Sequence, residues 1–179
     1  MAILEILKYP DLRLSIIAQP VENITGDIAR LINDMLETMY AAPGVGLAAN
    51  QVGALHRIIV LDVDHENPQK NIYKLINPTI AQSEGEILWE EGCLSVVDFT
   101  AEVRRAARVE VAALDENEKE IKIEAEGLLA VALQHEIDHL DGKLFIDRIS
   151  RLKRDLYTRK RKKMLRTGAT PSESRHVMI

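Results

Sequence analysis

Residues 127–140 read GLLAVALQHEIDHL, and this stretch decides the fold. Apolar residues recur here at helical spacing and give a wide face: Leu128, Leu129, Ala132 and Leu133. This pattern predicts a largely buried helix that stops near Gly142. A mostly apolar helix lies inside a protein rather than on its surface.

The end of this helix, HEIDH at 135–139, carries a metal-binding pattern. A helix places residues i and i+4 on one face, so His135 and His139 can bind one ion through their imidazole nitrogens. Glu136 is close enough to reach a water on that ion without being a ligand. The alternative is a core or surface helix that happens to contain two histidines. We favour the metal site, because buried polar side chains need partners.

The rest of the chain predicts an α+β fold, with mixed or antiparallel strands around the buried central metal-binding helix and a C-terminal helix. Thr25 is expected to cap a helix to about Tyr40, whose apolar face comprises Ile28, Leu31, Ile32, Met35 and Met39. Strand patterns occur at 57–63, 73–81, 84–89 and 101–105, and a hairpin joins 109–113 to 121–123 through DENEK. The last helix covers about 151–166, and GATPSESRHVMI is expected to be a frayed tail.

Length and composition favour one globular domain. The chain has 179 residues, 46% of them hydrophobic, with no internal repeat. The single cysteine excludes an internal disulfide framework and fits a reducing compartment. The start shows no secretory signal or transit peptide, and no uncharged apolar run reaches the roughly 18 residues that span a membrane. We therefore expect a cytoplasmic protein with no membrane contact.

Charge is distributed unevenly along the chain. Residues 1–148 contain 13 Lys and Arg against 26 Asp and Glu, whereas residues 149–179 contain 10 against 2. The basic segment RLKRDLYTRKRKKMLR at 151–166 could bind a polyanion. The alternative is a solvated helix face without a partner.

Two histidines leave a catalytic metal one protein ligand short. Asp141 and Asp147 lie downstream of the motif, and the only cysteine, Cys93, lies upstream in EGCLS. A thiolate is an excellent ligand for Fe²⁺ or Zn²⁺, but a single cysteine is more often a small buried apolar residue. The residues alone leave the third ligand open.

The string GVGLAANQVG at 44–53 contains small residues that permit close approach of the backbone to a ligand. Gln51 supplies an amide that can donate to a developing oxyanion. The alternative is a flexible turn between a helix and a strand.

Together, GVGLAANQVG, EGCLS and QHEIDHLDG resemble, in order and spacing, the three signature motifs of peptide deformylases. The resemblance extends from LKYPDLRL through INP at 76–78 to KLFIDRIS, about residues 3–150. It implies a catalytic domain over 1–150, followed by a basic helix and flexible tail over 151–179. The implied activity is metal-dependent hydrolysis, in which the formyl group of N-terminal formyl-methionine is removed from nascent polypeptides and formate is released.

The resemblance also implies roles for individual residues. Cys93, His135 and His139 correspond to the metal ligands, which usually bind Fe²⁺ and accept Zn²⁺, Ni²⁺ or Co²⁺. Glu136 corresponds to the proton-transferring glutamate. The oxyanion donors correspond to the Gln51 side chain and the Leu94 backbone N–H.

Substrate contacts implied by the resemblance begin with Gly46, whose backbone borders the substrate. A methionine slot is expected to involve Ile137 and Leu133, with Val45 at its mouth. Arg105 corresponds to an arginine that helps to position the substrate or the site loop, although we favour the alternative of a surface charge on a strand.

The sequence departs from the family pattern after EGCLS. Val96 is followed by Val97 and Asp98 where the family usually has a proline, so this loop is expected to be less rigid or to follow a different course. Asn50 replaces a more frequent threonine or proline, which is a minor change.

Partners and rival functions follow from the same resemblance. Deformylases act as chains leave the ribosome, so the basic segment is expected to bind ribosomal RNA, and we expect a monomer. A small zinc endopeptidase is the main enzymatic rival, and a ribosome-associated RNA-binding protein with a structural metal is the non-enzymatic one. The endopeptidase would not explain Cys93 or the 44–53 string, and a fourth coordination position filled by the protein would favour the structural metal.

Overall fold

The structure, a computed structural model, describes residues 2–64 and 67–168 of the chain. Its helices and 3₁₀ turns are η1 (Leu12–Ser15), α1 (Gly26–Ala41), η2 (Ala49–Val52), α2 (Gly127–Leu140), η3 (Phe145–Asp147) and α3 (Arg151–Thr167). Its strands are β1 (Gly46–Ala48), β2 (Ile58–Leu61), β3 (Tyr73–Glu84), β4 (Ile87–Cys93), β5 (Val96–Arg105), β6 (Arg108–Leu114) and β7 (Glu120–Glu126).

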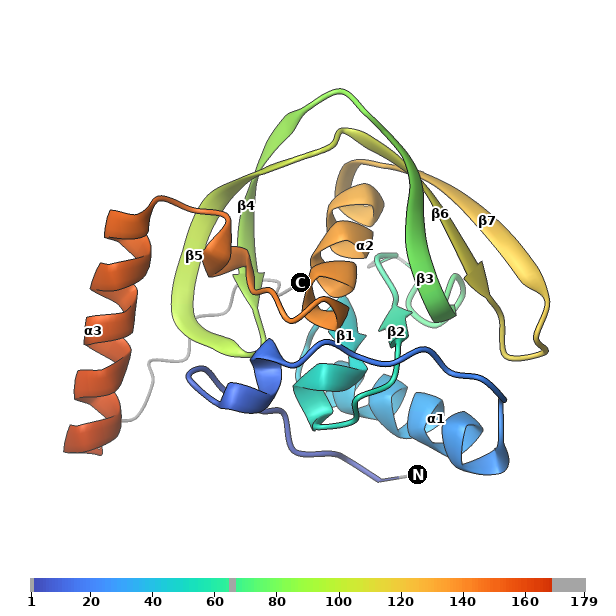
Figure 1. Ribbon diagram of the computed structural model, residues 1–179, viewed down its shortest axis with the longest axis horizontal. Helices are drawn as coiled ribbons and strands as arrows, with labels where there is room; N and C mark the ends of the chain where they lie inside the picture. The colour runs from blue at the N-terminus through green and yellow to red at the C-terminus, as the bar shows by residue number, and fades with distance from the viewer. Residues whose placement is uncertain (1, 65–66, 169–179) are drawn as a thin grey trace.

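The strands form two sheets around α2 (Figure 1). One has five strands in the order β1-β2-β3-β6-β7, and the other is the β4–β5 pair. The ladders between these strands are antiparallel. In Figure 1 the connections from β3 to β4 and from β5 to β6 arch over α2. The expected α+β fold, with strands around a buried helix and a C-terminal helix, is confirmed.

Helix α2 begins directly after β7. Gly127 has φ +57°, a backbone conformation that glycine adopts without strain, and it turns the chain from strand to helix. Every residue from Ala130 to Leu140 is buried, as the apolar pattern predicts. The polar side chains of the helix therefore need partners within the protein.

Strand β2 is apolar throughout because it is covered on both faces. Alternate residues of a strand point to opposite sides. Ile58 and Val60 pack in the cluster that contains α1, whereas Ile59 and Leu61 pack in the cluster that contains α2. The buried strand predicted at 57–63 is thus confirmed as β2, whose residues 58–61 form the apolar run.

Helix α1 matches its prediction closely. The Thr25 side chain accepts a hydrogen bond from the Ile28 amide and caps the helix. Four of the five residues predicted for the apolar face are buried, namely Ile28, Ile32, Met35 and Met39. The fifth, Leu31, is partly buried.

Two local predictions are wrong. The predicted strand at 84–89 spans a turn, since β3 ends at Glu84 and β4 begins at Ile87. The flexible turn given as the alternative for 44–53 is also not what forms there, because this segment contains β1, which pairs with β2, followed by the 3₁₀ turn η2. Pairing with a neighbouring strand, rather than local pattern, creates β1.

Helix α3 is capped by Ser150, whose hydroxyl accepts a hydrogen bond from the Lys153 amide. It packs on the body through Tyr157 and Arg161, the two buried residues of this helix. Residues 169–179 of the expected tail lie outside the described residues. Within the described ranges, no helix has the length and apolar character needed to cross a membrane.

Candidate metal centre

The site brings together one residue of β4 and two of α2. The ligand atoms of Cys93, His135 and His139 all lie within 4.8 Å of one another, and all three residues are buried. Cys93 Sγ is 3.2 Å from His139 Nε2. The i, i+4 spacing predicts the shared helix face, and the sheet supplies the third donor.

The donor atoms fit a metal ion. His135 Nδ1 is 2.8 Å from Glu91 Oε2, which leaves Nε2 for a ligand. This Nε2 is buried and has no hydrogen-bond partner among the described residues. A carboxylate that orients a ligating histidine through its other nitrogen is a common feature of metal sites.

Burial keeps the candidate ligands uncharged as long as no cation is bound. Burial and, to a lesser degree, the nearby Glu136 raise the pKa of the Cys93 thiol to about 12. Burial and the neighbouring His135 lower the pKa of His139 well below its usual range. Neutral imidazole is the form that binds a metal, and coordination deprotonates a thiol. The cluster therefore has the chemistry of a Cys-His-His metal site.

Glu136 lies beside this cluster with its carboxylate buried. Neither oxygen has a hydrogen-bond partner among the residues described. A Cβ atom at Gly46 would lie 2.5 Å from Glu136 Oε1, so only glycine leaves room for the carboxylate. Burial, followed by the charge of Glu91, raises the pKa of Glu136. Gly46 thus lies against the Glu136 carboxylate, whereas the close approach of this string to a ligand stays a prediction.

Gln51 joins the 44–53 string to the β4–β5 turn. Its Oε1 accepts a hydrogen bond from the Ala48 amide at 2.8 Å. Its Nε2 lies 3.2 Å from Ser95 Oγ and 3.7 Å from Cys93 Sγ. The amide donor therefore faces the cluster, beside the turn that carries Leu94.

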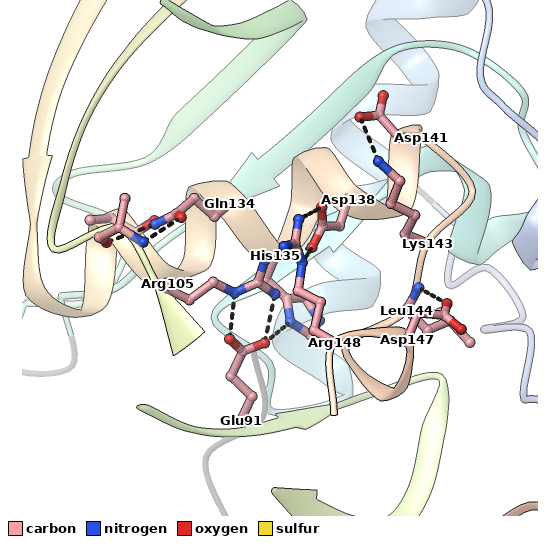
Figure 2. Close-up of polar contacts among 12 residues, drawn as sticks. Glu91, Arg105, Gln134, His135, Asp138, Asp141, Lys143, Leu144, Asp147 and Arg148 are labelled. Atoms are coloured by element: carbon pink, nitrogen blue, oxygen red, sulfur yellow. Dashed lines mark hydrogen bonds and ion pairs between the residues drawn. The ribbon is translucent and has the colours of Figure 1, made fainter. Parts of the chain in front are cut away.

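Arg105 is buried, so the favoured expectation of a surface charge is wrong. Its guanidinium donates to both oxygens of Glu91, at 2.6 and 2.9 Å, and to Asp138 Oδ2 at 2.5 Å. Arg148 donates to the same Asp138 carboxylate. Figure 2 shows this network running from β4 across α2, with His135 attached through Glu91.

The residues expected to form a methionine slot are apolar and buried. Val45, Leu133 and Ile137 belong to one core cluster, which includes much of α2 and the five-stranded sheet. Leu133 and Ile137 are four residues apart and share a face of α2.

The two alternative third ligands lie outside the cluster. Asp141 pairs with Arg57 at 2.9 Å. Asp147 accepts a hydrogen bond from the Leu144 amide and pairs with Arg154.

The predicted set lacks Glu91 and Asp138, which orient the groups around the cluster. One pattern points to Glu91: it precedes Cys93 by two residues in EGCLS, and the period of a strand places both on one face. A buried carboxylate beside a metal ligand then needs a partner such as Arg105.

Val97 and Asp98, which stand where the family usually has a proline, lie in strand β5. Cys93 pairs with Val96, so Leu94 and Ser95 form a tight turn between β4 and β5. Asp98 has φ +55°, and the Val97 carbonyl accepts a hydrogen bond from the Tyr157 hydroxyl of α3.

Comparison with known proteins agrees with this geometry. The family model for polypeptide deformylase matches residues 3–155. The peptide deformylase of Thermodesulfovibrio yellowstonii is 58% identical over 160 residues, covering 89% of this chain and 97% of that protein. The peptide deformylase of Syntrophobacter fumaroxidans is 53% identical, covering 93% and 98%.

Solved structures show the same fold. A peptide deformylase from Legionella pneumophila superposes with a TM-score of 0.88 at 48% identity, covering 96% of this chain and 100% of that one. A peptide deformylase from Ehrlichia chaffeensis in complex with actinonin gives a TM-score of 0.86 at 42% identity, covering 93% and 99%. The chain therefore belongs to the peptide deformylase family.

Proposed function

We propose that this chain deformylates with Cys93, His135 and His139 as its metal ligands and with Glu136 as its proton carrier. The reaction is that of the family: hydrolytic removal of the formyl group from N-terminal formyl-methionine of nascent polypeptides, with release of formate. The observation that carries the assignment is the buried cluster of three donor atoms beside an unpartnered carboxylate.

The metal and Glu136 have different roles in the proposed reaction. A bound metal supplies Lewis acidity, which lowers the pKa of water and polarises a carbonyl. Glu136 takes the proton from the attacking water and returns it to the leaving amine. Burial raises the pKa of Glu136, and this higher proton affinity helps the carboxylate to take the proton from the attacking water.

Two donors are assigned to the developing oxyanion. Gln51 Nε2 faces the cluster, as its contacts with Ser95 and Cys93 show. The Leu94 N–H belongs to the peptide next to Cys93. Donors that are fixed before the reaction stabilise charge as it develops.

Substrate recognition is assigned to the residues next to the carboxylate. Gly46 borders the substrate with its backbone, and Val45, Leu133 and Ile137 accept the methionine side chain. Arg105, buried between Glu91 and Asp138, acts on the substrate indirectly by orienting these two carboxylates.

The metal is proposed to be Fe²⁺, with Zn²⁺, Ni²⁺ or Co²⁺ as possible substitutes. A thiolate and two imidazoles suit each of these ions. The test is formate release from formyl-Met-Ala-Ser by protein purified without oxygen, together with metal analysis. Rapid release with one ferrous ion per chain, lost on peroxide treatment, is expected. No release from fully metal-loaded protein would contradict the proposed function.

The catalytic domain is proposed to span 1–150, and the basic C-terminal helix and tail to span 151–179. The protein is proposed to be a cytoplasmic monomer whose basic helix binds ribosomal RNA. Helix α3 turns Tyr157 and Arg161 inward, whereas its other Lys and Arg residues are exposed. Phosphate contacts made by exposed cations are independent of sequence and weaken with salt.

Charge reversal tests ribosome binding without removing Tyr157 from the core. Replacement of Arg159, Lys162 and Arg166 by Glu should abolish salt-sensitive co-sedimentation with ribosomes. The matched control reverses three exposed cations elsewhere: Arg30, Lys70 and Lys119. Equal co-sedimentation of both variants would refute this partner.

A further inference from the structure

The segment Leu7–Tyr9 crosses both loops that carry the proposed oxyanion donors. The Leu7 amide donates to the Gln51 carbonyl at 2.7 Å, and the Tyr9 amide donates to the Ser95 carbonyl at 2.8 Å. Between these two bonds, Lys8 Nζ donates to the Leu94 carbonyl at 2.5 Å. Three consecutive residues thus connect the 44–53 string to the β4–β5 turn.

The Leu94–Ser95 peptide lies between a cation and the thiol sulfur. The carbonyl of this peptide, on Leu94, accepts a hydrogen bond from the Lys8 ammonium. Its N–H, on Ser95, donates to Cys93 Sγ at 3.4 Å. The dipole of this peptide is thus aligned between the Lys8 ammonium and the Cys93 sulfur. Hydrogen bonds to charged groups are shorter and stronger than neutral ones, and bonds in such a series strengthen one another.

The segment is fixed from its other side by α3. Arg161 Nε donates to the Tyr9 carbonyl at 3.0 Å, and the Tyr9 hydroxyl lies 3.0 Å from Thr158 Oγ1. Lys8 therefore extends from a backbone that is anchored on both sides, although the residue itself is partly exposed.

We propose that Lys8 is a positioning residue of the deformylase: it fixes the Leu94–Ser95 peptide and thereby keeps the Leu94 N–H and the Cys93 sulfur in place. This inference rests on the roles proposed above for Cys93 and Leu94. Lys8 acts through the turn rather than on the substrate.

The experiment compares Lys8→Met, which keeps the length of the side chain without its charge, with Lys8→Arg, which keeps the charge. The control is Lys119→Met, at an exposed lysine in the β6–β7 turn. For Lys8→Met we expect kcat with formyl-Met-Ala-Ser to fall about 10–100-fold with little change in KM, the usual range for residues that orient a metal site. Lys8→Arg should retain most of the activity, and Lys119→Met all of it.

Two readouts do not depend on turnover. In Lys8→Met, the thiolate-to-cobalt absorption band of the Co²⁺-substituted protein should shift, and the Ser95 and Val96 amides should exchange hydrogen faster. Lys119→Met should change neither. If the wild-type chain itself released no formate, the proposed function would fail, yet these two readouts would still decide whether Lys8 orders the turn.

The inference would be overturned by unchanged kcat in Lys8→Met. An equal loss in Lys8→Arg, or a loss of kcat with the absorption band and amide exchange unaltered, would also overturn it. A fall in melting temperature alone would assign Lys8 a structural role only.

Discussion

Glu136 is surrounded so closely that its size matters as well as its charge. Its carboxylate lies against Gly46, in space that a Cβ there would fill. Glu136→Gln keeps the shape and removes the proton carrier, so kcat should fall about 10²–10⁴-fold. Metal content should stay near that of the wild type, because Glu136 is not a ligand. Formate release and metal analysis on one preparation test both statements.

A suitable control makes the same chemical change on the surface. Glu124→Gln alters an exposed residue of β7 and should leave kcat unchanged. Turnover by metal-loaded Glu136→Gln at the wild-type rate would show that another group moves the protons.

Arg105 carries a positive charge that two buried carboxylates require. The side chains of Arg105 and Glu91 are 1% and 0% exposed. Arg105→Met would leave Glu91 and Asp138 without their shared partner, and removal of one member of a buried ion pair costs about 3–5 kcal/mol. Urea unfolding of the variant should show a loss of this size.

The neighbouring arginine provides the comparison. Arg104 pairs with Glu86 on the surface and is 66% exposed, so Arg104→Met should change stability by about 0.5 kcal/mol or less. Similar values for the two variants would mean that the network around Asp138 adds little to the folded state.

Sequence separation explains which site residues could be predicted. His135, Glu136 and His139 follow from helix geometry within five residues. The contacts of Glu91 with His135 and of Lys8 with Leu94 span 44 and 86 positions. Such pairs depend on how β4 packs against α2 and how the N-terminal segment packs against the β4–β5 turn. No local sequence pattern indicates this packing. The burial of Arg105 escaped prediction for the same reason, since its partners lie on β4 and α2.

At the scale of elements, α1 is attached to the end of β2 by a tyrosine. The Tyr40 hydroxyl donates to Asp62 Oδ2 at 2.6 Å. Burial, followed by this hydrogen bond and the charge of Asp62, raises the pKa of Tyr40. The neutral phenol is thus the stabilising form, so its contribution is complete below the unfolded pKa of about 10 and is lost as the pH rises beyond it.

Comparison with Tyr40→Phe measures this contribution. Near pH 8 the variant should be less stable by about 1.5–3 kcal/mol, the range for a hydrogen bond to a charged group. The difference in unfolding free energy should shrink between about pH 10 and 11, as the unfolded chain loses its phenolic proton. A difference that stayed constant over this range would rule out the coupling.

Helices whose apolar residues recur at regular spacing could be predicted from the sequence. Strands that form only because they pair with a neighbouring strand could not. Helix α2 has an apolar face, and α1 has both a cap and an apolar face. Strand β1 consists of three residues, Gly46–Ala48, and exists because it pairs with Val60 and its neighbours on β2. The break between β3 and β4 falls inside an apparently continuous strand pattern, where the chain leaves one sheet for the other.

At the scale of the whole molecule, the candidate metal site lies where separately packed parts meet. Cys93 belongs to the cluster that contains β5, η3 and Tyr157 of α3. The histidines lie on α2, whose apolar residues pack with the five-stranded sheet. An ion bound by all three ligands would therefore tie the β4–β5 pair to the rest of the core.

This placement predicts that metal removal loosens the molecule as a whole. A ligand that binds only the folded state stabilises it by about 1.4 kcal/mol for each tenfold rise in free ligand above Kd. Chelation should therefore lower the melting temperature, and unfolding free energy should rise with the logarithm of free metal. In His139→Ala this dependence should weaken, because one ligand is lost. An unfolding free energy that did not respond to metal in the wild type would mean that the cluster binds the ion too weakly to join the two sheets.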